Sequence, residues 1–403
     1  MEAVNTDPFG VYVHIPFCAH RCDYCDFATW TDRSHLMVDY VDACVTDIER
    51  RFADGALRPA SSVFFGGGTP SLLDADLLVR ILDAIPRAPG AEVTVECNPD
   101  SVDGAKLTAY RTAGVDRLSF GVQSSRTHVL AALGRTHDRA NVARSIESAR
   151  DTGFARVSVD LIYGTPGESI ADWRQTLDDV LALEPDHVSA YALTVEPATP
   201  MGKRVAAGLS RAPDDDDQAD KYAIADERLV AAGFAWYEIS NWARPGQECR
   251  HNLVYWTGAD YLAIGCAAHG YTRGRRWWTV RTPEQYIERV TENGTGGTEA
   301  GSETLTPTAR AEEAFALAIR LRDGVEVAPA ALETVRDLAD GGLLDRDAAP
   351  QRAVLTRTGR LMGSDVTARL LLAGAAATDV TSDERKGEVH ADATMRIAGT
   401  RYH

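Results

Sequence analysis

Several features common in other classes of protein are missing from this chain of 403 residues. No apolar run approaches the ~18 consecutive residues that a membrane-spanning helix needs. The stretch 1–10 at the N-terminus is short and polar. Basic residues are also few, because 42 Lys and Arg stand against 59 Asp and Glu, a formal net charge of −17. Nucleic-acid backbones require a dense basic face. We therefore expect a cytoplasmic protein whose partners are small molecules and proteins, with no nucleic acid.

Cysteine is scarce and odd in number. The chain has 7 cysteines, which cannot all pair with one another, and no apolar signal stretch opens the sequence. A framework of disulfides is typical of small secreted domains. The pattern therefore favours a reducing compartment and free thiols.

The residues that are present fit a large α/β domain. With 44% hydrophobic residues, the chain can bury one domain of about 250 residues and smaller additions. Short apolar runs alternate with amphipathic stretches of period near 3.6. Strands are expected at 11–15, 62–65, 93–97, 117–121, 157–162 and 188–193. Such βα units predict a parallel sheet, doubly wound or curled into a full or partial barrel, with its functional site at the carboxyl ends of the strands.

Three cysteines form a pattern directly after the first expected strand. Cys18, Cys22 and Cys25 have the spacing Cys-x3-Cys-x2-Cys. Thiolates hold iron–sulfur clusters, four of them when every iron is capped, so three would leave one iron with an open position for a ligand. A structural zinc site that adds His14 or His20 is the alternative.

Unusual residues also follow the next expected strands. Gly66, Gly67 and Gly68 would let backbone groups approach a charged ligand closely. The carboxylates of Glu96 and Asp160 could bind ribose hydroxyls or an ammonium group. A plain turn explains the glycines equally well, and helix capping or a salt bridge explains the acids. These residues by themselves leave both interpretations open.

Together these motifs resemble the radical S-adenosylmethionine (SAM) superfamily. The cysteine pattern with Tyr24, followed by Gly-Gly-Gly-Thr-Pro at 66–70, carries the resemblance. Four further runs narrow it to the oxygen-independent coproporphyrinogen III oxidase-like family: His-Ile-Pro-Phe at 14–17, Gly-Val-Gln-Ser at 121–124, Gly-Arg-Thr-His at 134–137 and Asp-Leu-Ile-Tyr-Gly-Thr-Pro at 160–166. The resemblance implies a parallel (βα)6 partial TIM barrel with added strands and a small C-terminal helical or winged-helix-like domain.

The resemblance also divides the chain. An N-terminal tail at 1–10 precedes the radical SAM barrel at 11–235, and a family-specific extension follows at 236–305. The small C-terminal domain is expected at 306–373. The polar, aperiodic residues 374–403 are expected to be disordered.

The family's cofactors and their contacts follow from the same resemblance. It implies a [4Fe-4S] cluster on Cys18, Cys22 and Cys25, whose remaining iron is chelated by the amino and carboxylate groups of SAM. The cluster-bound SAM is expected to contact Tyr12, Gly67 and Glu96, with His269 nearby. A second SAM-like site is expected on Tyr24, Gly68, Thr69, Gln123, Arg135, Asp160 and Ala192. Arg135 could pair with a carboxylate through two hydrogen bonds, and a surface salt bridge is an equally good interpretation.

Three features separate the oxidases of this family from its haem chaperones. Phe27 stands where the oxidases have a further cysteine, and only seventeen residues precede Cys18, whereas the oxidases have a long segment there. The run His-Asn-Leu-Val-Tyr-Trp at 251–256 resembles the His-Asn-x-x-Tyr-Trp signature of the HemW chaperones. All three favour a chaperone that binds haem and passes it to acceptor haemoproteins, including membrane-associated ones.

His251 is the candidate haem ligand, because neutral imidazole is a common ligand of haem iron. Cys249 is the alternative ligand as a thiolate, and both side chains could equally be ordinary core residues. The alternative function is a radical SAM oxidase or dehydrogenase that takes hydrogen from a propionate side chain of coproporphyrinogen III. A zinc-stabilised barrel is a third interpretation. Any of these proteins could form a homodimer.

Overall fold

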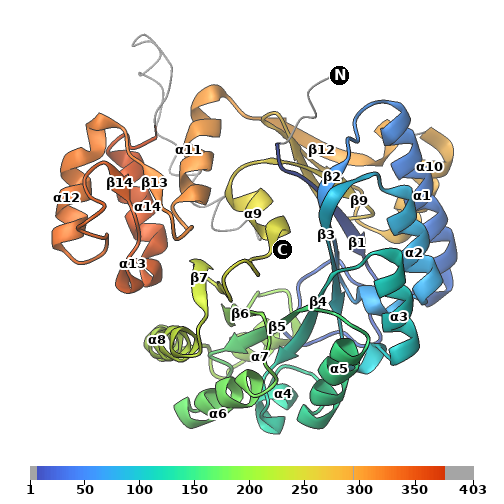
Figure 1. Cartoon of the computed structure of the whole chain (residues 1–403), viewed down its shortest axis with the longest axis horizontal. Helices are drawn as coiled ribbons and strands as arrows, with labels where there is room; N and C mark the ends of the chain where they lie inside the picture. The colour runs from blue at the N-terminus through green and yellow to red at the C-terminus, as the bar shows by residue number, and fades with distance from the viewer. Residues whose placement is uncertain (1–6, 294, 377–403) are drawn as a thin grey trace.

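The computed structural model describes residues 7–293 and 295–376. Across these residues runs a 12-stranded sheet in the order β12-β11-β10-β9-β1-β2-β3-β4-β5-β6-β8-β7. Its central strands are parallel and consecutive in sequence: β1 (Phe9–Ile15), β2 (Ala60–Gly67), β3 (Arg87–Cys97), β4 (Arg117–Gln123), β5 (Arg156–Tyr163) and β6 (His187–Ala192). They curl into the partial barrel of Figure 1, which confirms the predicted fold class.

Helices between these strands cover the outer face of the sheet (Figure 1). Their bounds are α1 (Met37–Ala53), α2 (Ala75–Ala84), α3 (Gly104–Ala113), α4 (Thr127–Ala132), α5 (Arg139–Asp151) and α6 (Ile170–Leu181). Local sequence fixes where they begin. At the start of α6, for example, the Ser169 hydroxyl accepts a hydrogen bond from the N–H of Asp172, and the Asp172 carboxylate bonds back to the N–H of Ser169.

An apolar layer lies between the sheet and these helices. Alternate residues of a strand point to opposite faces, and on β1 Val11, Val13 and Ile15 all point outward and are fully buried. They belong to one large core with Tyr40 and Ile48 of α1. Burying an aliphatic side chain is worth roughly 1.5–3 kcal/mol. This layer therefore stabilises the barrel from outside and leaves its interior for other side chains.

The inner face of the strands is largely polar. The register pairs Glu96 of β3 with Ser119 of β4, and Asp160 of β5 with Ser189 of β6. All four side chains face the interior of the barrel, where Phe64 of β2 is an apolar neighbour. The site is therefore built inside the barrel rather than on its helical surface.

Elements that follow β6 extend both edges of the sheet. β8 (Asn241–Ala243) pairs with β6 and β7 (Ala235–Glu238) pairs with β8, both antiparallel. At the other edge, β9 (Asp260–Ile264) runs parallel to β1 and leads into β10 (His269–Thr272), β11 (Arg275–Thr279) and β12 (Glu299–Thr304). The accompanying helices are α7 (Pro200–Ala206), α8 (Asp215–Ala231), α9 (Arg250–Trp256) and α10 (Pro283–Asn293). Figure 1 shows α9 on the open side of the curved sheet.

A smaller unit forms the C-terminal part of the described chain. It contains α11 (Pro307–Ala318), α12 (Leu332–Asp340), α13 (Arg357–Leu361), α14 (Gly363–Leu372) and the paired strands β13 (Val325–Glu326) and β14 (Arg352–Ala353). Phe315, Val335 and Leu370 belong to its own hydrophobic cluster. The Arg360 guanidinium fastens the unit to α8 through an ion pair with Asp226 at 2.9 Å. Its winged-helix character stays a prediction.

The two tails expected from the sequence can be compared with the structure only in part. Phe9 and Gly10 already belong to β1, so the strand begins inside the expected N-terminal tail. Of the expected C-terminal tail, residues 377–403 lie outside the described residues. Short 3₁₀ turns occur at Ser34–Leu36, Pro70–Leu72, Pro99–Ser101, Thr295–Thr298 and Pro329–Ala331. No helix in the described part of the chain is both long and apolar enough to cross a membrane.

Candidate functional site

A large cavity opens at the carboxyl ends of the parallel strands. Its volume is about 790 Å³, within the ~300–1,000 Å³ range of small-molecule and cofactor pockets. The lining comes from the cysteine loop, the inner faces of β2 to β6, the segment from β7 to α9, and the C-terminal unit. The cavity thereby brings together residues from Cys18 to Ser364.

Most of the site residues expected from the sequence line this cavity. They are Cys18, Cys22, Tyr24, Cys25, Gly67, Gly68, Thr69, Glu96, Gln123, Arg135, Asp160 and Ala192. Three expected residues, Tyr12, His251 and His269, do not line it. The structure places each of these three differently.

The three cysteines lie on the loop that follows β1. Its shape is fixed by backbone hydrogen bonds, in which the Cys18 N–H donates to Trp30 O at 3.0 Å and the Cys25 N–H donates to Cys22 O at 3.2 Å. All three thiols are free and partly buried. Burial raises the pKa of Cys18 and raises that of Cys25 to about 11. A metal that binds these thiols must therefore displace their protons.

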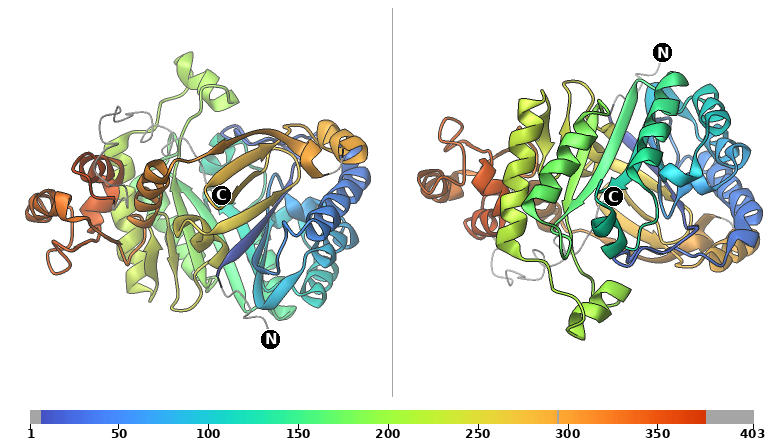
Figure 2. Two further views of the ribbon diagram at one scale, coloured as in Figure 1. Left: turned by 90° about the horizontal axis from the view of Figure 1, so that it is seen from above. Right: turned by 90° about the horizontal axis from the view of Figure 1, so that it is seen from below.

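Asp23, between the second and third cysteines, fastens the cysteine loop to two neighbouring segments. Its N–H donates to Leu133 O at 3.2 Å, and its carbonyl oxygen accepts from the Met201 N–H at 2.9 Å. Its carboxylate pairs with Arg204 of α7 at 2.8 Å. In Figure 2, α7 belongs to the green segment that projects from the body of the protein. The position of the thiols thus depends partly on a helix far along the chain.

The zinc alternative depends on two histidines near the loop. Both ring nitrogens of His14 are engaged, Nδ1 with the Tyr12 hydroxyl and Nε2 with Ala28 O, each at 3.1 Å. Burial lowers the pKa of His14 to about 4, and His269 adds to this, so the ring is neutral. His14 therefore supports the floor of the site, and His20, which is exposed, is the histidine that a zinc site would need.

The glycine run after β2 lies directly beside the cysteine loop. Gly67 has a φ of +109°, and a Cβ at this position would lie 2.5 Å from the His14 ring. A Cβ at Gly68 would lie 2.7 Å from Phe17 O and 3.0 Å from Cys18 Sγ. Only glycine fits at these two positions. A ligand bound at Cys18 would therefore meet bare backbone along this edge.

Glu96 is a buried carboxyl group next to these glycines. Its Oε2 accepts a hydrogen bond from the Gly67 N–H at 3.2 Å. Burial raises the pKa of Glu96 to about 8, and Asp160 adds repulsion. Tyr12 lies on the same side, since a Cβ at Gly66 would touch both its ring and Glu96 Oε2. Glu96 thus holds a proton at neutral pH unless a cation is bound beside it.

Arg135 lines the cavity next to the cysteine loop, close to Tyr24 of that loop. Its guanidinium donates to Gly121 O at 3.3 Å. Its buried Nε has no hydrogen-bond partner within the described residues. Burial raises the pKa of Tyr24, and the charge of Arg135 opposes that shift. This side of the cavity therefore offers a cation with unused donor capacity.

Asp160 is the acidic counterpart on the same side. It accepts from the Ser119 hydroxyl at 3.0 Å, and burial raises its pKa although Ser189 opposes the shift. Gln123 ends β4 with a φ of +62°, and Ala192 ends β6. All residues expected at the second SAM-like site thus line this one cavity.

His251 lies away from the cysteine loop, near the amino-terminal ends of β2 and β3. Its Nδ1 bonds with the Ser62 hydroxyl at 3.0 Å, its Nε2 with the Tyr255 hydroxyl at 2.8 Å, and its N–H donates to Glu92 at 3.1 Å. It is completely buried, and burial lowers its pKa to about 3. In this arrangement neither ring nitrogen is available to haem iron. Ligation by His251 therefore stays a prediction that requires one of these bonds to break.

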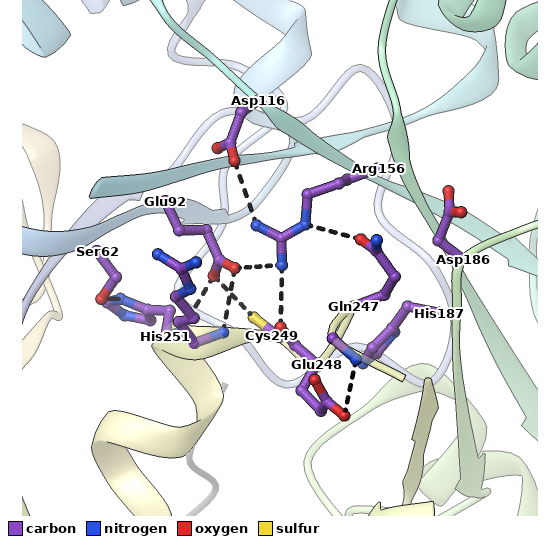
Figure 3. Close-up of polar contacts among 12 residues, drawn as sticks. Ser62, Glu92, Asp116, Arg156, Asp186, His187, Gln247, Glu248, Cys249 and His251 are labelled. Atoms are coloured by element: carbon purple, nitrogen blue, oxygen red, sulfur yellow. Dashed lines mark hydrogen bonds and ion pairs between the residues drawn. The ribbon is translucent and has the colours of Figure 1, made fainter. Parts of the chain in front are cut away.

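Figure 3 shows Glu92 in a network of polar contacts that also includes Arg156, Cys249 and His251. Arg156 pairs with Glu92 at 2.7 Å and with Asp116 at 3.2 Å, and it donates to Glu248 O at 3.0 Å. The Cys249 thiol lies 3.5 Å from the Glu92 carboxylate. Cys249 is fully buried, and burial raises its pKa to about 12. The alternative haem ligand is thus also a member of this closed network.

The rest of the His-Asn-x-x-Tyr-Trp run faces the cavity. Asn252, Tyr255 and Trp256 all belong to its lining. The His251 Nε2 forms a hydrogen bond with the Tyr255 hydroxyl. The run therefore contributes a wall to the cavity, with its histidine on the outer side of that wall.

His269 is the first residue of β10 and is exposed. Its ring lies 6.2 Å from that of Trp278, which is also exposed. His269 also contributes to the lowered pKa of His14. His269 thus lies outside the lining of the cavity.

Reasoning from the sequence missed several residues of the lining, namely Arg117, Ser119, Tyr191, Glu238, Asn241 and Arg320. Arg117 and Ser119 alternate along an expected strand that continues to Gly121, so the alternation of side chains could have identified them. No pattern in the sequence marks Arg320 as a lining residue, because it reaches the cavity only through the packing of the C-terminal unit.

Comparison with known proteins establishes the family. Residues 12–180 match the radical SAM superfamily. A heme chaperone HemW from Mycobacterium tuberculosis is 43% identical over 374 residues, which are 90% of this chain and 95% of the relative. The HemW of Bacillus subtilis is 33% identical over 89% of this chain and 97% of its own. The chain belongs to the HemW family. Members of this radical SAM family are expected to hold a [4Fe-4S] cluster and SAM.

The HemW family shares its fold with a solved enzyme. Coproporphyrinogen III oxidase (HemN) from Escherichia coli aligns with a TM-score of 0.78 and 23% identity over 90% of both chains. At this identity the likeness shows the fold alone. This HemW family member carries the donors that the family's cofactors need, because three thiols share one loop beside a backbone edge that only glycine permits and beside the Glu96 carboxyl group. Among the described residues, however, no three such side chains already lie close enough together to hold a metal ion, so cluster binding requires the cysteine side chains to move toward one another.

Proposed function

We propose that this protein is a haem chaperone, which binds haem in the cavity and transfers it to acceptor haemoproteins. The observation that carries the proposal is that one cavity joins the cysteine loop to Tyr255 and Trp256 of the His-Asn-x-x-Tyr-Trp run. Phe64 and Tyr191 add further aromatic rings to the lining, and such rings can stack on a flat macrocycle. The relatives named as heme chaperones support the same function.

The cysteine end of the cavity would hold the cofactors. Cys18, Cys22 and Cys25 would bind a [4Fe-4S] cluster, which supplies an iron position open to SAM. The backbone at Gly67 would face the SAM, and Glu96 would give up its proton and accept from the SAM ammonium group. Tyr12 would keep its bond to His14 below, and exposed His269 would stay at the rim.

A second SAM-like molecule would bind at the neighbouring wall. There the unused donor of Arg135 and the acceptor oxygens of Asp160 face the same space. Tyr24 would pack against the ligand. Gly68, Thr69, Gln123 and Ala192 would complete the contacts.

His251 has two possible roles in haem binding. As a ligand, it would have to exchange the Tyr255 hydroxyl for iron, which requires α9 to shift. In the described arrangement it instead orients Tyr255 toward the cavity. The acceptor haemoproteins, a cytoplasmic location, association with membrane-bound acceptors and a homodimer are proposals that rest on the sequence and the family.

The test is anaerobic reconstitution of the full chain with iron and sulfide, followed by two assays. Haem binding is followed by absorbance titration, and conversion of coproporphyrinogen III is followed with SAM and a reductant. The proposal predicts saturable binding of haem and no conversion. Sustained conversion by the pure protein would contradict the chaperone proposal and favour the oxidase function. A haem titration that does not saturate would also contradict the chaperone proposal.

A further inference from the structure

A second end of the cavity, away from the cysteine loop, is built by Glu238, Asn241, Trp256 and Arg320, which we call the distal corner. Glu238 ends β7, Asn241 begins β8, Trp256 ends α9, and Arg320 follows α11. All four line the cavity. In the strand order, β8 and β7 lie beyond β6, whereas the cysteine loop and the glycines follow β1 and β2. The distal corner is therefore a separate chemical environment within one cavity.

Polar groups in the distal corner lack partners. Among the described residues, Glu238 Oε2, Asn241 Oδ1 and Arg320 Nε are buried and form no hydrogen bond. The Glu238 carboxylate and the Arg320 guanidinium are 3.6 Å apart, which is an ion pair but too long for a hydrogen bond. A buried polar group without a partner costs about 1–3 kcal/mol, and native proteins have few of them. Beside a cavity, the unpaired Nε–H of Arg320 indicates a ligand with an acceptor oxygen, whereas the oxygens of Glu238 and Asn241 need a donor such as water.

Arg320 is already positioned to bind an anion. Its Cζ lies 4.5 Å from the centre of the Trp256 ring, and its side chain is 33% exposed. The ring supports one face of the guanidinium, and Glu238 lies along one edge. Glu238 is itself fixed, because its other carboxylate oxygen accepts from the Ser240 N–H at 2.9 Å. The remaining N–H groups of Arg320 can therefore serve a carboxylate, which a guanidinium binds through two parallel hydrogen bonds.

We propose that the distal corner binds a propionate carboxylate of haem, with Arg320 as the anion-binding residue and Trp256 as its support. This inference rests on the proposed function, since it names the part of haem that this end of the cavity recognises. Haem is flat and carries its two carboxylates on one edge. Anchoring that edge at Arg320 directs the opposite edge of the ring toward the cysteine end.

The experiment compares haem with its dimethyl ester, in which both carboxylates are blocked. Each is titrated by absorbance into the full reconstituted chain in the same solvent. We expect the wild type to bind haem at least about tenfold more tightly than the ester. In Arg320→Gln, which keeps an amide donor beside Glu238, the ratio of the two affinities should fall toward one. A general loss of structure would weaken both ligands and leave the ratio unchanged.

Arg369→Gln is the matched control. Arg369 lies on α14, pairs with Asp365 and is 57% exposed outside the cavity lining. The control should keep the wild-type ratio. Three results would overturn the distal corner as the carboxylate site: a wild-type ratio near one, an unchanged ratio in an Arg320→Gln protein that binds the ester as tightly as the wild type, or an equal fall in Arg369→Gln. If neither ligand saturates the wild type, haem binding itself fails, which is a different outcome from the loss of discrimination.

Discussion

Glu92 and Glu96 lie on the same face of β3, four residues apart, yet their surroundings are opposite. Burial alone would raise the pKa of Glu92, but Arg117, Arg156 and two backbone N–H donors outweigh it, and the pKa is lowered. Glu96 accepts a hydrogen bond from the Gly67 N–H, but burial and the repulsion from Asp160 outweigh it and raise the pKa of Glu96 to about 8. One strand thus carries a charged acid at the closed base of the barrel and a protonated acid at its open end.

The different surroundings of Glu92 and Glu96 separate a structural region of the barrel from its candidate functional site. At the closed base, Glu92 is surrounded by Arg156, Cys249 and the N–H groups at the start of α9, so every partner is already present. At the open end, Glu96 lies between the cysteine loop and Asp160, with a cavity in front of it. We therefore expect Glu92, whose partners are all present, to stabilise the fold. We expect Glu96, which faces the cavity, to change its protonation when a ligand binds.

The largest effect that separates the two ends is loss of the cluster. Cys22→Ala removes one of three thiolates, so we expect iron and sulfide to fall from about four each per chain to almost none after anaerobic reconstitution. Cys44→Ala is the control, because Cys44 is buried on α1, outside both the cysteine loop and the cavity lining. Metal analysis measures both variants. Stoichiometric zinc in the wild type, or retention of iron by Cys22→Ala, would show that the loop is not a cluster site.

The two acids should differ next in stability. Glu92→Gln leaves Arg156 without its buried partner, and breaking such a pair costs about 3–5 kcal/mol in the free energy of unfolding. Glu96→Gln should not lower stability at pH 7 and should raise it, because the folded wild type holds a proton on Glu96 that the unfolded chain has released, whereas glutamine needs no proton. Urea unfolding of the metal-free protein measures both. Equal losses in the two variants would contradict the division between a closed base and an open end.

The next prediction concerns His251, which connects the closed base of the barrel to the wall of the cavity. His251→Ala deletes the bonds to Ser62 and Tyr255, and we expect haem affinity to fall about tenfold as Tyr255 loses its support. Tyr255→Phe removes one of those bonds and separates the two roles of His251. If His251 only orients Tyr255, the absorption bands of bound haem should keep their positions in His251→Ala. A shift of those bands in His251→Ala, absent in Tyr255→Phe, would identify His251 as an iron ligand.

A further effect at the open end is expected in the pH dependence of SAM binding. Glu96 keeps its proton up to about pH 8, and a SAM ammonium group needs the carboxylate. Binding must then release a proton, so SAM affinity should rise about tenfold per pH unit up to pH 8 and level off above it. Calorimetry in buffers of different ionisation enthalpy measures the released proton. Glu96→Gln should flatten the profile, and an unchanged slope in that variant would assign the proton to another group.

The raised pKa of Glu96 also affects stability with a definite sign. The unfolded chain releases this proton in the ordinary range of glutamic acid, whereas the folded chain keeps it to about pH 8. Between those values the folded state binds more protons, so its stability falls as pH rises. Glu96→Gln should remove this part of the pH dependence.

Much of the barrel could be read from the sequence because its strands follow simple patterns. Apolar outward positions such as Val11 and Val13 mark β1, and the glycines and cysteines mark the loops at its open end. These patterns predicted a parallel α/β sheet, and the resemblance of the motifs to radical SAM proteins predicted the partial barrel and the family, both of which are confirmed. The boundary of the N-terminal tail was less accurate, because pairing of β1 with β2 and β9 extends the strand to Phe9.

Other parts of the site depend on contacts that no local pattern contains. His251 is within a recognisable run, yet its position on the outer side of the cavity wall follows from bonds to Ser62 and Glu92, which are far from it in sequence. Arg320 reaches the cavity because the C-terminal unit is fastened to α8 through Arg360. Burial and long-range pairing, rather than residue type, decide which of these side chains a ligand can meet.

The most direct test of the central claim is a crystal structure of the reconstituted protein with haem bound. The account predicts the macrocycle inside the cavity of about 790 Å³, between the cysteine loop and Trp256, with the network of Glu92 and Arg156 unchanged. Haem bound outside this cavity, or between the residues of the closed base, would contradict it.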